Sequence, residues 1–253
     1  MNDQGRRQAQ YKISEAKWTT QALWFVVLFA GLLASLGGSW ALHKPVDYGY
    51  AFWYQQMDIG PHIDRYGPKN RYIRGFDQVS SEEHIALFGG IVESVHDHGR
   101  GLDELSFVDG RGRTKTLLRE PEVVHLQDVA NLIDVLTYAA IVALIIAAVG
   151  TEMLVRWRVR IRWRLQAMLL GGFLAGLGLI TVLIGPKDVF YQLHIWVFPE
   201  DHQWFFYYQD SLMSTMMKAP DLFGGIAVTL VAGGVIVFGC YLLLIRRLID
   251  RLQ

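Results

Sequence analysis

Four long apolar stretches constrain this chain more than any other feature of its sequence. The stretches 22–42, 165–184 and 222–245 each run for about 20 residues or more without a charged side chain, and 135–154 carries one charge near its end. An α-helix needs about 20 apolar residues to cross the ~30 Å hydrocarbon core of a bilayer. The sequence therefore predicts an all-α membrane protein with four transmembrane helices. Within the stretch 165–184, the sequence Gly172-x-x-x-Gly176 permits close helix packing.

The distribution of positive charge predicts how the chain is oriented. Lysines and arginines concentrate in a leader at 1–21, a short loop at 156–164 and a tail at 246–253. Loops rich in these residues face the cytoplasm, so we expect an N-in/C-in topology. The arginines of the short loop are typical of a juxtamembrane segment against anionic lipid, rather than of a nucleic-acid site. The segments 43–120 and 185–221 are then extracytoplasmic.

The segment 43–120 is too long to be a simple connection, and we expect it to form a mixed cap between the first two spans. The sequence Ser-Ser-Glu-Glu at 80–83 fits a capping box ahead of an amphipathic helix, on which His84 is expected at the surface. Asp109-Gly110 lies between two short strand-like stretches and predicts a hairpin. The only cysteine lies in the last apolar stretch, so no disulfide framework is available.

A helix predicted over 121–155 carries the first candidate site into the second span. Pro at its first position lacks the amide hydrogen that would otherwise go unpaired. Glu122, His125 and Asp128 follow at three-residue spacing and share one face. A carboxylate beside an imidazole can hold one tautomer and stabilise the charged form, so we expect Asp128 to orient His125 and Glu122 to flank it. The alternative is a solvated helix start whose acids are favoured by the helix dipole.

The second candidate, His194, lies in 185–221, which carries nine aromatic residues between positions 190 and 208. An aromatic belt of this kind is typical of the membrane interface. Burial there would lower the pKa of His194 and favour the neutral, basic imidazole. The alternative is a histidine that only anchors the chain at the interface. We interpret His202, which follows two acids and a proline, as part of a turn.

Both motifs resemble those of a family of four-span bacterial membrane proteins that includes the lipoprotein intramolecular transacylase. The first motif is Glu-Val-Val-His-Leu-Gln-Asp-Val at 122–129, and the second is Leu-His-Ile-Trp-Val-Phe-Pro at 193–199. Trp204, Asp210 and Pro220 follow in the family's order. The second motif departs from the family pattern, because leucine precedes the histidine and valine stands at 197 where an aromatic residue is expected.

The resemblance implies an acyltransferase that moves an acyl chain from the sn-2 ester of a diacylglyceryl lipoprotein to the amine of its N-terminal cysteine. It needs no cofactor or metal, because the ester is already activated. The partners implied are a diacylated bacterial lipoprotein and the phospholipid bilayer, with a monomeric enzyme in the bacterial inner membrane and its site on the extracytoplasmic face. The residues implied are His125 and His194 as catalytic groups, with Asp128, Glu122, Trp204 and Asp210 in support.

Two other interpretations of the sequence stay open. In a metal-dependent membrane hydrolase, His125, Asp128 and His194 would bind the metal and Glu122 would act as the base. Loss of activity with a chelator, regained with zinc, would favour it. In a non-enzymatic membrane scaffold, the histidines would only anchor helices, and replacing both would leave the phenotype unchanged.

Overall fold

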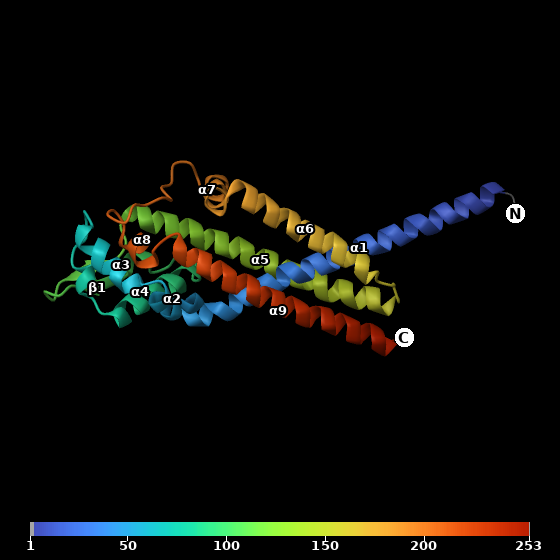
Figure 1. Ribbon diagram of the computed structural model, residues 1–253. Helices are drawn as coiled ribbons and strands as arrows, with labels where there is room; N and C mark the ends of the chain where they lie inside the picture. Colours follow the sequence, from blue (N-terminus) through green and yellow to red (C-terminus); the bar gives the residue numbers. More distant parts are fainter. Residues whose placement is uncertain (1–2, 253) are drawn as a thin grey trace. The chain divides into compact units, whose positions relative to one another are not determined.

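The computed structural model describes the backbone of residues 3–252 and the side chains of residues 18–251. Four of the described helices are long and apolar enough to cross a membrane, which confirms the expected all-α class with four candidate spans (Figure 1). They are α1 (Asp3–His43), α5 (Glu120–Arg156), α6 (Trp163–Ile184) and α9 (Asp221–Leu252). The N-in/C-in orientation stays a prediction.

The chain divides into two compact units. The first consists of Met1–Gly38, Ala139–Val189 and Gly234–Gln253, within the described residues, and the second of Ser39–Tyr138 and Phe190–Gly233. The long helices α1, α5 and α9 each contribute residues to both units.

Small residues let the helices of the first unit approach closely. A Cβ added at Gly31 would lie 2.1 Å from the ring of Tyr241, and one added at Gly150 would lie 2.4 Å from a methyl group of Val27. The expected packing role of Gly172-x-x-x-Gly176 is wrong, because a Cβ at either glycine meets nothing within 4 Å among the described residues. Those two glycines lie on α6, whose most apolar stretch is only 6% buried within the structure.

The second unit contains the predicted mixed cap, built from short helices and one hairpin. Within 43–120 the elements are η1 (Lys44–Gly49), α2 (Tyr50–Gln56), α3 (Ile59–Tyr66), η2 (Gly67–Lys69), η3 (Phe76–Gln78), α4 (Ser81–Val95), η4 (Leu102–Glu104), β1 (Ser106–Val108) and β2 (Thr114–Thr116). The same unit also contains most of α7 (Pro186–Val197) and all of α8 (Leu212–Met217) from the segment 185–221. Their apolar faces form one core, in which the rings of Tyr50 and Phe88 stack at 3.9 Å.

The local sequence signals of the cap are confirmed in two places. The Ser80 side chain accepts a hydrogen bond from the Glu83 backbone amide and caps α4. The strands β1 and β2 pair antiparallel, with Phe107 opposite Lys115. The Asp109 carboxylate accepts from the backbone amides of Arg111 and Arg113 in the turn between them, which lowers its pKa.

The surface position expected for His84 is wrong. Its ring is buried, donates from Nε2 to the Phe76 carbonyl oxygen (3.1 Å) and accepts at Nδ1 from the Tyr54 hydroxyl (2.8 Å). Both ring nitrogens are therefore satisfied inside the core, where an unpaired polar atom would be costly.

Candidate active site

The start of α5 places His125 inside the apolar core of the second unit. Glu120 and Glu122 stand in the first turn, where the helix dipole favours acids, and His125 follows with 9% of its surface exposed. Its ring centroid lies 5.0 Å from that of Phe198 and 6.1 Å from that of Phe206. The imidazole is thus enclosed by aromatic rings.

His194 lies near the end of α7, and its backbone partner fixes its tautomer. Its Nδ1 is 2.8 Å from the carbonyl oxygen of Phe190, one helical turn earlier. A carbonyl only accepts, so Nδ1 carries the hydrogen and, in the neutral ring, Nε2 is left with a free lone pair. Burial lowers the pKa of His194, and the bond to Phe190 opposes this to a smaller extent. The neutral base is favoured near pH 7.

The two predicted histidines come together in the structure. Their ring centroids are 6.4 Å apart with the planes tilted by 32°, and the ring of Phe198 lies 5.0 Å from one and 5.1 Å from the other. Trp204, also predicted, packs 4.9 Å from His194. Residues 69 positions apart in the chain thus form one cluster of two imidazoles and their aromatic neighbours.

The expected contact of Asp128 with His125 is not found. The Asp128 carboxylate instead accepts a hydrogen bond from Nδ1 of His202, at 2.6 Å, and this bond raises the pKa of His202. Nδ1 of His125 is buried and has no hydrogen-bond partner among the described side chains and backbone. The short aspartate side chain bonds to the loop after α7 rather than to the neighbour on its own helix, because a shared helix face permits a hydrogen bond between two side chains but does not by itself form one. His202, interpreted from sequence as a turn residue, is therefore part of this site.

Glu122 also differs from expectation, because it does not flank His125 as a free acid. Its side chain is fully buried and accepts from the Ser211 hydroxyl (2.5 Å) and from the Arg119 backbone amide (2.9 Å). The Arg119 side chain adds an ion pair at 3.2 Å. The Ser211 hydroxyl in turn accepts from the Ser214 amide and caps α8. Glu122 thus ties the start of α5 to the start of α8.

Asp210 lies apart from these contacts, and the candidate metal ligands do not form a cluster. Asp210 pairs with Arg71 at 3.3 Å. Within the part of the chain that the structure describes, no group of three or more His, Cys, Asp and Glu side chains is placed to hold a metal ion. The set proposed for a hydrolase is divided, since Asp128 is engaged by His202.

The chain resembles known proteins both in the sequence around the two histidines and in its fold. Residues 103–219, which include both histidine motifs, match the sequence model of the family described as lipoprotein intramolecular transacylase Lit. The structure is also similar to solved structures of the membrane integral lipoprotein intramolecular transacylase Lit from Bacillus cereus. Together these matches show that the chain is similar in sequence to the Lit family over residues 103–219 and similar in fold to the Lit structures.

The likeness to the Lit structures extends over nearly the whole chain. A variant of the Bacillus cereus protein with one histidine replaced by arginine gives a TM-score of 0.66 at 16% identity, covering 97% of each chain. A second structure gives 0.62 at 16% identity, covering 92% of this chain and 97% of that one. At such identities the likeness shows a shared fold. No curated protein sequence gives a significant match.

Proposed function

We propose that this chain is a lipoprotein intramolecular transacylase-like acyltransferase. It moves the sn-2 acyl chain of a diacylglyceryl lipoprotein to the amine of the N-terminal cysteine. The observation that carries the proposal is the pair His125 and His194, brought within 6.4 Å of each other among aromatic rings. The match of residues 103–219 to the Lit family supports it.

His194 serves as the base that moves the proton. The cysteine amine has a pKa near 8 when free, so its ammonium form must first release a proton to water before the neutral amine can attack. The amine nitrogen then forms a bond to the ester carbonyl carbon, and Nε2 of His194 takes the second proton that nitrogen must shed. The carbon–oxygen bond to glycerol breaks, and His194 returns that proton to the departing oxygen. The products are an amide on the cysteine and a free hydroxyl on glycerol.

His125 stabilises the charge that develops on the ester oxygen. A neutral imidazole keeps one N–H, and a donor aimed at a developing oxyanion is worth more in an apolar site than in water. The unpaired buried Nδ1 of His125 supports this role, because such a nitrogen lowers the stability of the fold and a catalytic function explains why it is retained. The aromatic neighbours Phe198, Phe206 and Trp204 exclude water, which favours transfer over hydrolysis.

Asp128 and His202 act as positioning residues. Their 2.6 Å pair joins α5 to the loop that follows α7, and this same loop carries Trp204 and Phe206. Holding the loop against α5 keeps the aromatic walls on the two catalytic histidines. No cofactor is required, because both reacting groups belong to one molecule and the ester supplies the leaving group. We place the enzyme, as a monomer, in the bacterial inner membrane with this site on the extracytoplasmic face.

Mass spectrometry of a lipoprotein tests the proposal. Cells that make a diacylated lipoprotein, with and without this protein, supply the N-terminal peptide for analysis. Transfer gives a peptide with one acyl chain on the cysteine amine, one on glycerol and an unchanged total mass. Release of free fatty acid, with the matching loss of mass, would instead show a hydrolase, and an unchanged fragmentation pattern would refute the acyltransferase.

A further inference from the structure

Buried side chains of α1 hold the backbone of the link between α5 and α6. The Gln21 side chain donates to the Arg160 carbonyl oxygen (2.8 Å) and accepts from the backbone amide two residues further on (3.0 Å). The Trp24 indole donates to the Val159 carbonyl oxygen at 3.1 Å. Gln21 and Trp24 are themselves buried, at 5% and 0% exposure. The link begins with a turn at Trp157 and Arg158 and has no regular secondary structure after it, yet these hydrogen bonds fix its backbone, so its side chains start from defined positions.

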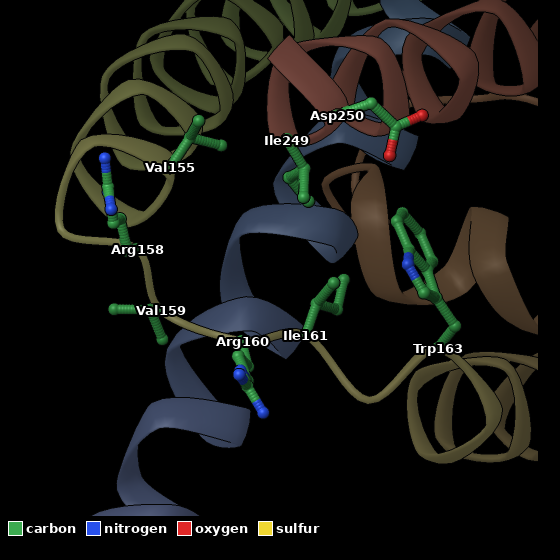
Figure 2. A pocket seen from close by; sticks show the side chains of 8 residues that line it. All are labelled: Val155, Arg158, Val159, Arg160, Ile161, Trp163, Ile249 and Asp250. Carbon is green, nitrogen blue, oxygen red and sulfur yellow. The ribbon is translucent and has the colours of Figure 1, made fainter. Parts of the chain in front are cut away.

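A cavity of about 350 Å³ opens between this link and the end of α9 (Figure 2). Arg158 and Arg160 line it from the link, and Asp250 lines it from α9 on the other side. Trp163 and aliphatic side chains such as Ile161 complete the wall. Because α5 and α6 are both candidate spans, the link that joins them lies at a bilayer surface, among the lipid headgroups.

The side chains that the structure describes offer no acidic partner to the two arginines of the cavity. Among the described residues, neither Arg158 nor Arg160 forms an ion pair, whereas Arg156 nearby is paired with Glu152 at 2.6 Å. Arginine presents N–H donors in a fork that matches phosphate oxygens. With two arginines against one carboxylate, the cavity carries a net positive charge and favours an anion.

We propose that this cavity binds the headgroup of an anionic glycerophospholipid. The phosphodiester oxygens accept from Arg158 and Arg160, and a headgroup hydroxyl donates to the Asp250 carboxylate. Trp163 and the aliphatic wall contact the glycerol and the first acyl carbons, a setting that free phosphate cannot use. The site belongs to the first unit, and it is independent of the proposed acyl transfer, which uses residues of the second.

Native mass spectrometry of the full-length protein in detergent tests this site. The probes are phosphatidylglycerol, phosphatidylcholine and inorganic phosphate at matched concentrations. We expect one phosphatidylglycerol to bind at least tenfold more tightly than either of the other two. Arg158→Gln and Arg160→Gln should each weaken that binding about fivefold, the effect expected for one arginine near an anionic headgroup.

Arg162→Gln is the matched control. This variant removes one positive charge from the same link. The bond between Arg162 and Gln21 uses the Arg162 backbone amide, so the substitution leaves that bond in place. The Arg162 side chain is not among those that line the cavity. We expect a change of less than twofold. Equal weakening by Arg162→Gln would show a diffuse charge effect and overturn the site. Equal binding of phosphatidylcholine would exclude charge recognition, and equal binding of inorganic phosphate would show a free-phosphate site instead.

Discussion

Replacing Glu122 with glutamine tests whether its carboxylate stabilises the fold or takes part in catalysis. Its carboxylate is fully buried and accepts from the Ser211 hydroxyl and the Arg119 backbone amide, beside the Arg119 side chain. Glutamine offers one acceptor oxygen, so its NH₂ group must face one of these two donors. The Ser211 hydroxyl can rotate and accept, but the Arg119 amide cannot. The loss of one charged hydrogen bond predicts about 2 kcal/mol of destabilisation.

Ser211→Ala provides the partner for a double-mutant cycle. It removes the donor to Glu122 and also the cap on the Ser214 amide, for a total of about 2 kcal/mol. Because both single changes remove the charge-assisted hydrogen bond between Glu122 and Ser211, the double variant should fall short of the sum of the two by about 1.5 kcal/mol. The measurement is unfolding by SDS titration in mixed micelles, followed by tryptophan fluorescence.

Activity measured well below the unfolding midpoint completes this test. If Glu122 is structural, the folded fraction of Glu122→Gln turns over at close to the wild-type rate. Two results would exclude a structural hydrogen bond between Glu122 and Ser211 as the role of this carboxylate. One is additivity of the two variants within about 0.5 kcal/mol, which would mean that their hydrogen bond contributes nothing. The other is a fully folded but inactive Glu122→Gln, which would return Glu122 to the chemistry.

Three further predictions concern the site and the topology. The ring protons of His194 should titrate, by NMR, with a midpoint below 6.5, because burial disfavours the charged form; a midpoint above 6.5 would contradict the neutral base. Asp128→Asn and His202→Gln should each lower turnover several-fold, and combining them should cost no more than either alone; full activity of His202→Gln would remove it from the positioning pair. A periplasmic reporter should be active when fused after Gly110 and inactive after Arg162, and activity at Arg162 would invert the topology.

Local patterns in the sequence predicted much of the fold. The lengths of the apolar stretches predicted the four candidate spans, and the sequence at 80–83 predicted the cap of α4. Asp109-Gly110 predicted the hairpin of β1 and β2. Each of these depends on residues close together in the chain, so that spacing alone carries the information.

Contacts between distant segments were harder to predict. The spacing of His125 and Asp128 established a shared helix face, but the residue that meets Asp128 is His202, 74 positions later. Two acids and a proline precede His202, and this local pattern indicates only a turn. Likewise, the sequence around Glu122 does not indicate that its carboxylate accepts a hydrogen bond from Ser211. Such partners are set by how the loop after α7 packs on α5, which a single sequence does not reveal.

The proposed acyl transfer depends on His125 and His194 acting together. The most direct measurement is a single-turnover reaction of purified protein with a synthetic diacylated lipopeptide, followed by mass spectrometry. Wild-type protein should yield the N-acylated lyso product, while His125→Ala and His194→Ala should each yield none, although both accumulate folded in the membrane. Product formation near the wild-type rate by either folded alanine variant would show that the replaced histidine is not catalytic.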